Sequence, residues 1–379
     1  MKLDLKYGCN PHQARAAISH PGEPLRVLNG VPGYINLLDA LTAWQLVREL
    51  KRATGKTAAA SYKHVSPAGA AIARPLTEEF CRSQFVKMEE YSDVACAYIR
   101  ARAGDRLCSF GDVAAVSDTV DVSLARVLKR EVSDLIVAPA FEEEALEMLK
   151  SKKGGNYVIL EMNPDYEPPE IEHRELFGFT LEQERDRGDV GDLFQDLPMA
   201  QRETMQVATL ALKFAQSNSV CVAWDGQVIG LGAGQQSRIH CTRLACDKAE
   251  KWMLQFHPRV LELPFVEGLG RPERTNAIDQ FLLWDALSPP ERKDLLSLFT
   301  AAPEPLSREE RIEWVGRFDD LCLSSDAYIP FRDNIDRAAT SNIRIIAHPG
   351  GSVRDEAVKD ACAEHGIRLI ETGLRCFLH

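Results

Sequence analysis

Apolar residues recur along this chain with two periods, one helical and one extended. The clearest helix is predicted over Tyr34 to Thr54, and Gly55 follows it as a stop signal. Its apolar stripe recurs every three positions and consists of Leu38, Leu41, Trp44, Val47 and Leu50. Short apolar runs that suit buried strands lie at residues 57–62, 134–139 and 157–160, with a helix at 142–150. This βαβα order predicts an α/β fold with a mixed or parallel sheet.

Residues 163–198 break this pattern, because they are rich in Pro, Asp, Glu, Arg and Gly and lack a clear period. We interpret them as an extended connector. They separate a first predicted α/β domain, residues 1–195, from a second, residues 196–379. In the second domain, Asp225-Gly226 predicts a two-residue hairpin turn between apolar strands. A mostly helical stretch at residues 257–318 is predicted to be an insertion in that domain.

Composition and charge narrow the functions that the chain could have. Its 379 residues are 45% hydrophobic and 27% charged, which is the balance of an ordinary globular protein. The 45 Lys and Arg are outnumbered by 56 Asp and Glu, and the net charge of -11 argues against nucleic acid or anionic membranes as partners. The N-terminal residues lack the apolar core of a signal peptide, and the ten cysteines form no Cys-x-x-Cys pair. A cytoplasmic protein with reduced thiols is therefore expected.

One dipeptide carries candidate chemistry. Lys63 and His64 follow a predicted strand and open the predicted loop that ends at Gly69. Histidine can accept a proton at neutral pH, and lysine can stabilise developing negative charge. Loops at strand ends are also where α/β folds place reactive groups. The alternative is a surface lysine beside a histidine that is bonded to the backbone, and the dipeptide alone does not decide between them.

Three further segments have both a functional and a structural interpretation. The glycine-rich residues 230–238 lack the spacing of a dinucleotide fingerprint, which leaves either close ligand approach with Arg238 as an anion contact, or a bend after a hairpin. The turn at 349–352 leads into a helix, where Ser352 and Asp355 fit an N-cap box and free N–H groups would suit an anion. Residues 330–336 are either a helix start or a binding wall. His240 and nearby cysteines lack the second pair that a zinc site needs.

Taken together, these segments resemble one family in order along the chain. The matching motifs run from residue 6 to the C-terminus and lie at 6–13 (KYGCNPHQ), 28–36 (LNGVPGYIN), 61–69 (SYKHVSPAG), 109–112 (SFGD), 130–134 (REVSD), 216–220 (QSNSV), 232–243 (GAGQQSRIHCTR), 330–333 (PFRD) and 373–379 (GLRCFLH). They are similar to the transformylase portion of the bifunctional purine-biosynthesis protein. That portion is the formyltransferase for 5-aminoimidazole-4-carboxamide ribonucleotide (AICAR), and it uses 10-formyltetrahydrofolate.

The resemblance implies a fold of two cytidine-deaminase-like α/β domains with a helical insertion in the second. It also implies a homodimer with active sites at the subunit interface. Family proteins usually begin with an IMP cyclohydrolase domain, whereas this sequence starts where the transformylase part would. We therefore expect a monofunctional enzyme whose product is consumed by a separate IMP cyclohydrolase. Lys6 departs from the usual arginine, which removes a bidentate fork from a possible phosphate contact.

The resemblance also assigns roles to individual residues. It makes His64 the proton acceptor and Lys63 the stabiliser of the transition state. It places AICAR against Lys6, Tyr7, Gly111, Asp134, Asn218, Tyr328 and Arg375. It places the folate against Arg238, Asp333, Ser352 and Val353. The resemblance implies a structural potassium ion and no catalytic metal. Two alternatives stay open: a non-catalytic purine-nucleotide sensor, and an enzyme of this fold with another formyl donor or another aminoimidazole acceptor.

Overall fold

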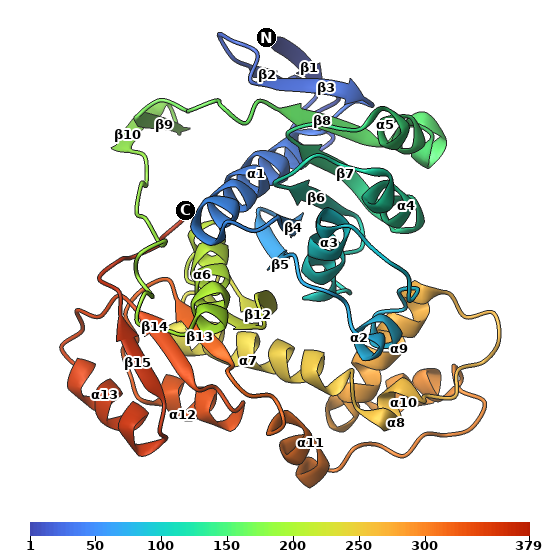
Figure 1. Ribbon diagram of the computed structural model, residues 1–379, viewed down its shortest axis with the longest axis vertical. Coiled ribbons are helices and arrows are strands. Elements are labelled where there is room, and N and C mark those ends of the chain that lie inside the picture. The colour runs from blue at the N-terminus through green and yellow to red at the C-terminus, as the bar shows by residue number, and fades with distance from the viewer.

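A single mixed sheet of eleven strands runs through the molecule (Figure 1). The computed structural model describes all 379 residues. Along the sheet the strands follow the order β3 (Leu25–Asn29), β8 (Val158–Met162), β7 (Ser133–Ala138), β6 (Asp112–Val116), β4 (Ala58–Lys63), β5 (Ser66–Ile72), β12 (Gln227–Gly232), β11 (Val220–Trp224), β13 (Cys322–Ser325), β14 (Ile345–His348) and β15 (Arg368–Glu371). Parallel pairs β6–β7–β8 and β13–β14–β15 flank a central antiparallel block. The α/β prediction with a mixed sheet is therefore confirmed.

Helices cover both faces of the sheet in Figure 1. Their bounds are α1 (Tyr34–Thr54), α2 (Glu78–Ser83), α3 (Asp93–Ala103), α4 (Val122–Arg130), α5 (Glu143–Lys150), α6 (Met199–Lys213), α7 (Arg238–Leu254), α12 (Asp333–Thr340) and α13 (Asp355–Glu364), with a 3₁₀ turn at Lys152–Gly155. The alternation of β4 shows how the layers form: Ala58, Ala60 and Tyr62 pack in the core that contains α1 and α6, whereas Ala59 faces the core of α3, α4 and α5.

Helix α1 has the bounds that its apolar stripe predicts. It ends because Gly55 adopts a left-handed conformation with φ 69°, which only glycine reaches without a Cβ penalty, and the Gly55 N–H bonds back to the Lys51 carbonyl. Trp44 and Val47 from the stripe are buried against the sheet. One carboxylate, Asp39, lies on this buried face although it is charged.

Two predictions about strands are wrong. The chain does not loop from Lys63 to Gly69, because β5 begins at Ser66 and forms a two-residue hairpin with β4. The proposed connector contains a second hairpin, β9 (Ile171–Leu176) and β10 (Phe179–Glu184), which we call the arm. Both arm strands are exposed along nearly their whole length, and their few apolar residues lack the regular alternation that predicts a buried strand. A third hairpin, β1 (Lys2–Leu5) with β2 (Ala16–Ser19), stands at the N-terminus.

Helices α8 (Pro258–Leu261), α9 (Arg271–Leu282), α10 (Pro289–Leu296) and α11 (Arg308–Val315), with a 3₁₀ turn at Trp284–Ala286, lie between α7 and β13 and have a small core of their own. At the middle of the sheet, β5 and β12 pair at one position, Ala71 opposite Gln227. The division into two domains at residue 195 stays a prediction. None of the helices combines the length and apolar character that crossing a membrane requires.

Candidate functional site

Lys63 and His64 lie at the tip of the β4–β5 hairpin. His64 is exposed, and Lys63 is partly buried with its Nζ donating to the Phe110 carbonyl at 2.6 Å. His64 and Val65 are the two turn residues, and both have positive φ, 54° and 57°. Neither side chain is buried in the core. An ammonium and an imidazole are thus held together on an accessible turn.

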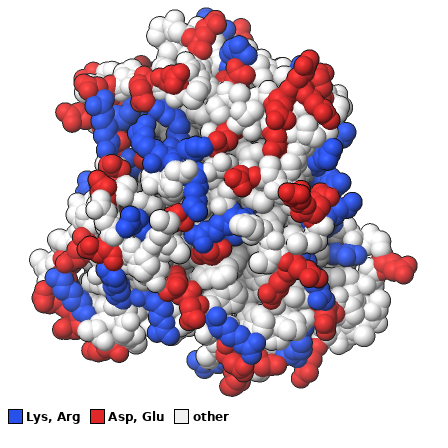
Figure 2. All heavy atoms as spheres, in the orientation of Figure 1, with Lys and Arg blue, Asp and Glu red and all other residues white.

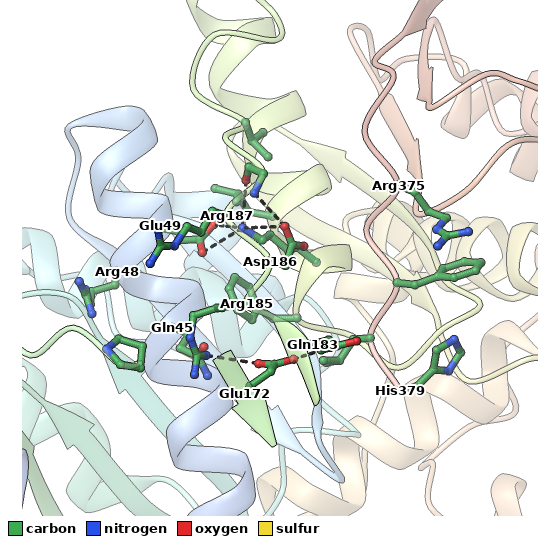
Figure 3. Close-up of a pocket in the computed structure, with 18 of the residues that line it drawn as sticks. Gln45, Arg48, Glu49, Glu172, Gln183, Arg185, Asp186, Arg187, Arg375 and His379 are labelled. Atoms are coloured by element: carbon green, nitrogen blue, oxygen red, sulfur yellow. Dashed lines mark hydrogen bonds and ion pairs between the residues drawn. The ribbon is translucent and has the colours of Figure 1, made fainter. Parts of the chain in front are cut away.

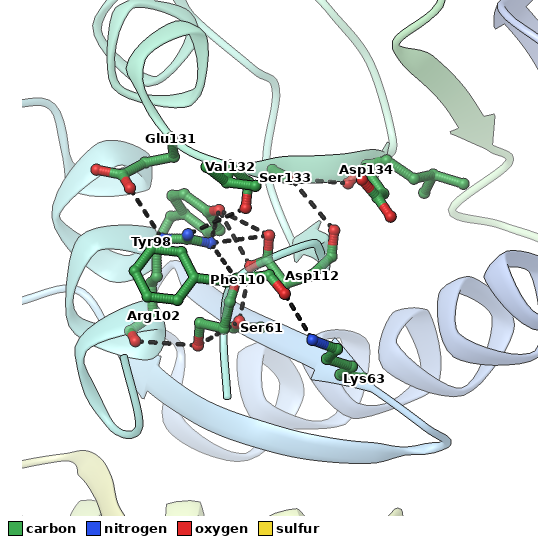
Figure 4. Close-up of polar contacts among 12 residues, drawn as sticks. Ser61, Lys63, Tyr98, Arg102, Phe110, Asp112, Glu131, Val132, Ser133 and Asp134 are labelled. Carbon is green, nitrogen blue, oxygen red and sulfur yellow. Dashed lines mark hydrogen bonds and ion pairs between the residues drawn. The ribbon is translucent and has the colours of Figure 1, made fainter. Parts of the chain in front are cut away.

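The loop that receives Lys63 rests on a buried polar network (Figure 4). Asp112, the first residue of β6, is completely buried; its carboxylate accepts from Ser61 Oγ at 2.6 Å and pairs with Arg102 Nη1 at 2.9 Å. Arg102 Nη1 also donates to the Ser109 carbonyl at 2.7 Å. Because Phe110 lies between these anchored residues, its carbonyl presents a fixed acceptor to Lys63.

The charges in this network are balanced. Burial opposes the charge of Arg102, yet the neighbouring Tyr98, Asp112 and Glu131 outweigh it and raise its pKa. Burial likewise acts against the Glu131 carboxylate, but Arg102, Arg106 and Arg271 lower its pKa below the usual value. Glu131 Oε1 accepts from Arg271 Nη1 at 2.6 Å, which ties helix α9 to this side of the sheet.

The catalytic candidates adjoin a second segment from the other half of the sheet. Ser66 Oγ accepts the Gln216 N–H at 3.2 Å, so the hairpin contacts the stretch that contains Asn218. Ser217 exchanges two hydrogen bonds with Leu378, one through its N–H and one through its Oγ, each 3.0 Å long. The C-terminal tail, residues 373–379, is therefore held next to the same segment.

Arg238 is buried and bonds to Asn218. The sequence predicts instead an arginine that is free to contact an anion. The Arg238 side chain is 6% exposed; Nη2 donates to Asn218 Oδ1 at 2.9 Å and Nη1 to the Ser219 carbonyl at 2.6 Å. The Arg238 guanidinium also forms an ion pair with the buried Asp326. Asp326 Oδ2 in turn accepts from Ser219 N–H at 2.9 Å. The chain of contacts fixes Asn218 from behind.

The glycine-rich segment serves packing along most of its length. A Cβ on Gly230 would lie 2.1 Å from the Ala245 carbonyl oxygen, and one on Gly232 would lie 2.3 Å from that of Cys241. Both glycines therefore let β12 approach helix α7 more closely than any side chain permits. Only Gly234 belongs to a turn, where its N–H donates to the Gln216 carbonyl at 2.8 Å.

A cavity of about 1740 Å³ opens beside the hairpin, between α1, the arm, α6 and the tail (Figure 3). Its basic wall residues are Arg48, Arg52, Arg174, Arg185, Arg187, Lys213 and Arg375. Figure 2 shows basic side chains gathered around a hollow in the upper left of the view, where α1 and the arm lie in Figure 1. Val65 and Gln216 line the cavity, whereas Lys63 and His64 do not, so the pair lies at its edge.

Arg375 is a wall cation without a carboxylate partner. Its guanidinium lies 4.8 Å from the ring centroid of Phe377 and forms no ion pair, unlike Arg48 with Glu167 or Lys213 with Glu49. Figure 3 shows Arg375 and the tail on the side of the cavity opposite α1. An anion in the cavity could therefore use Arg375 without displacing a carboxylate.

Other residues predicted to contact the nucleotide lie near the first half of the sheet. Gly111 faces Asp134, because a Cβ on Gly111 would lie 3.6 Å from Asp134 Oδ2, and Asp134 forms an ion pair with Lys153. Lys6 and Tyr7 follow β1, and the Lys6 Nζ stands 5.9 Å from the Tyr7 ring centroid. Gly111 follows Phe110 directly, so Gly111 and Asp134 are the predicted nucleotide contacts that lie beside Lys63.

Four predicted residues lie on the second half of the sheet. Tyr328 is half exposed, and Asp333, the first residue of α12, accepts from Asn334 Nδ2 at 2.9 Å. Ser352 Oγ accepts the Arg354 N–H at 3.2 Å, and Val353 is fully exposed. The structure brings none of these four into contact with Lys63 or His64.

Some residues of the site escaped the sequence analysis. The Val65 N–H donates to Asp39 Oδ1 at 2.6 Å, so a buried carboxylate from α1 supports the hairpin tip. The signal for Asp39 was present, because it is an acidic residue within an otherwise apolar helix face. Arg102 carries no such signal, and Asp112 stands out only as the last residue of the 109–112 motif, since their pairing depends on tertiary packing. No group of three or more His, Cys, Asp or Glu side chains suited to a metal ion occurs.

Comparison with known proteins gives a consistent family. Residues 1–248 match the family described as the AICARFT/IMPCHase bienzyme. The bifunctional purine biosynthesis protein PurH of Persephonella marina is 28% identical over 394 aligned residues, and that of Sinorhizobium fredii is 29% identical over 392. Each alignment covers this whole chain and 59% of the relative, so the chain spans about three fifths of the length of the curated relatives it matches.

Proposed function

Because the chain belongs to the AICARFT/IMPCHase bienzyme family, we propose that it transfers the formyl group of 10-formyltetrahydrofolate to the 5-amino group of AICAR. The products are the formylated ribonucleotide FAICAR and tetrahydrofolate, in the synthesis of IMP. The observation that carries this proposal is the accessible Lys63–His64 turn, which lies within the matched residues and beside the Asn218 segment.

The reaction needs a base and an oxyanion stabiliser, because the AICAR amine is conjugated with its ring and is a weak nucleophile. In the proposed mechanism, the amine nitrogen attacks the formyl carbon while His64 accepts its proton. Lys63 stabilises the oxyanion: one of its three donors is engaged by the Phe110 carbonyl, which leaves two free. The bond from the formyl carbon to N10 of the folate then breaks, and the proton returns from His64 to that nitrogen.

Substrate contacts follow from the same proposal. Arg375, Asn218, Gly111 and Asp134 would hold the ribonucleotide, together with Lys6, Tyr7 and Tyr328. Asp333, Ser352 and Val353 would contact the folate. Arg238 is proposed to act on the substrates through Asn218, because its guanidinium is buried and bonded to that side chain. A structural potassium ion and a cytoplasmic location stay predictions.

We also propose that the enzyme is a homodimer with active sites at the interface. The arm supports this, because its tip exposes Leu176, Phe177 and Phe179, and Phe177 is 97% exposed. Contiguous apolar side chains on an isolated hairpin are typical of a surface that a partner covers. The separation of Asp333 and Ser352 from the Lys63–His64 turn within one chain also suits a site completed by a second copy.

The test is an assay of the purified chain with AICAR and 10-formyltetrahydrofolate, following tetrahydrofolate release. We expect turnover, and a loss of about 10²–10⁴-fold in kcat for His64→Ala, which is the usual worth of a general base. His365→Ala is the matched control, because that histidine is on the surface and pairs with Asp336. Absence of turnover at saturating substrates would overturn the activity, and normal turnover of His64→Ala would overturn the base. Sedimentation at about the 42.2 kDa of one chain would contradict the dimer.

A further inference from the structure

The hairpin that carries Lys63 and His64 has an unfavourable backbone. Two-residue hairpins with both turn residues at positive φ are normally built from Asn-Gly or a similar pair. Here the residues are His64 at φ 54° and Val65 at φ 57°, and a β-branched side chain strongly disfavours that region. Strain of this kind persists only where the surroundings fix the conformation, and it is concentrated at functional sites.

Asp39 supplies that fixation. It lies in the second turn of α1, its side chain is 4% exposed, and its Oδ1 accepts the Val65 N–H at 2.6 Å. The carboxylate therefore sits directly beneath the turn. The charged or titratable groups that act on it are Lys63 and His64 from the hairpin and Tyr62 from β4.

We propose that Asp39 is a positioning residue, whose carboxylate holds the strained turn and stabilises the imidazolium that His64 becomes when it accepts a proton. This rests on the proposed function of His64 as the base. A fixed carboxylate close to a histidine base favours the protonated form that the base reaches in the transition state, because opposite charges attract.

The charged carboxylate of Asp39 lowers the stability of the fold, and this supports the proposal. Burial raises the pKa of Asp39 above its ordinary value, even though the Val65 N–H, His64 and Lys63 act in the opposite direction. A carboxyl whose pKa is raised on folding contributes its stability below the unfolded pKa, and that contribution is lost as the pH rises through the folded value. Near neutral pH the charged form of Asp39 therefore destabilises the fold, which is expected of a group kept for activity.

Asp39→Asn separates the two roles, because the amide oxygen can still accept the Val65 N–H while the charge is removed. We expect kcat to fall at least about 10-fold with KM changed less than about threefold, and the acid limb of kcat/KM to move to lower pH. The melting temperature at pH 7 to 8 should stay unchanged or rise. Asp39→Ala, which removes the acceptor as well, should lose about 100-fold in kcat.

Asp118→Asn is the matched control, because this carboxylate also pairs with a residue of helix α1. Asp118 pairs with Lys51 at the far end of α1, and although burial opposes it, hydrogen bonds from Lys51 and Ser117 lower its pKa. This variant should lose some stability and keep its activity, the reverse of Asp39→Asn.

Two readouts keep the proposal apart from the proposed function. If the chain shows no formyl transfer, the Val65 amide proton should still exchange with solvent faster in Asp39→Ala than in Asp39→Asn, and the melting temperature of Asp39→Asn should still not fall. A drop in melting temperature in step with kcat would make Asp39 a merely structural residue. An acid limb of kcat/KM that stays in place in Asp39→Asn would overturn the electrostatic role.

Discussion

Two buried arginine–aspartate pairs stand behind the candidate site, and they are completed differently. Arg102, paired with Asp112, uses all three of its nitrogens: Nε bonds Glu131, Nη1 bonds Asp112 and the Ser109 carbonyl, and Nη2 bonds the Val132 carbonyl. Arg238, paired with Asp326, leaves its Nε without a partner and spends one nitrogen on Asn218.

This difference indicates that the two pairs have different roles. The Arg102 pair joins α3, β6 and β7 into one rigid support, so breaking this pair should lower the free energy of unfolding. The Arg238 pair keeps Asn218, a proposed ribonucleotide contact, in place, so breaking this pair should lower turnover. Burial alone does not distinguish the two, since both arginines and both aspartates are buried.

The largest expected effect comes from breaking the first pair. Arg102→Met leaves Asp112 buried without its cation, and we expect a loss of about 3–5 kcal/mol in the free energy of unfolding, measured with urea. Arg317→Ala, which removes an exposed pair with Glu313, should cost less than about 1 kcal/mol. If both variants lost the same small amount, the network would not be the support described.

A smaller effect should come from the second pair. Arg238→Lys keeps a positive charge near Asp326 but loses the fork that also reaches Asn218. We expect turnover to fall about 10-fold, while the free energy of unfolding falls by about 1–2 kcal/mol. Asn218→Ala should match the loss of turnover with less loss of stability. A lysine variant with full activity would show that Asn218 needs no support.

The smallest effect on stability is expected from a change at Glu131. Its pKa is lowered, since Arg102, Arg106 and Arg271 outweigh burial, so its contribution is present above the ordinary carboxyl value and is lost as the pH falls through the folded one. Glu131→Gln should therefore cost about 1 kcal/mol at pH 7, and the difference from the parent protein should shrink below about pH 4. A difference that grew towards acid pH would contradict this sign.

The sequence allowed the elements with strong local signals to be predicted. Helix α1 was predicted to the residue because its apolar stripe and Gly55 are both local, and the turn at Asp225-Gly226 for the same reason. The arm was missed because its strands bury nothing. In the sequence, strand β5 resembles a loop because Pro67 and Gly69 are typical of turns. The structure shows a different reason for Gly69, because α3 passes too close to this position for a side chain.

The candidate site was predictable only in part for the same reason. Lys63 and His64 could be found because they are adjacent and chemically distinctive. The folate contact of Arg238 stays a prediction, whereas its bonds to Asn218 and Asp326 could not be predicted from the sequence. The direction of the Arg238 side chain depends on residues 20 to 90 positions away in the sequence, and no local pattern encodes such contacts.

The narrow join between β5 and β12 has a consequence for how the molecule opens. Beyond the pairing of Ala71 with Gln227, the Ile72 N–H bonds the Gly226 carbonyl at 3.0 Å and Gln227 Nε2 bonds the Arg100 carbonyl at 2.8 Å. Few backbone bonds thus hold the two halves of the sheet together, and side chains do the rest. Amide protons along this seam would exchange with solvent before those of the flanking ladders, so the seam defines a natural line of subglobal opening.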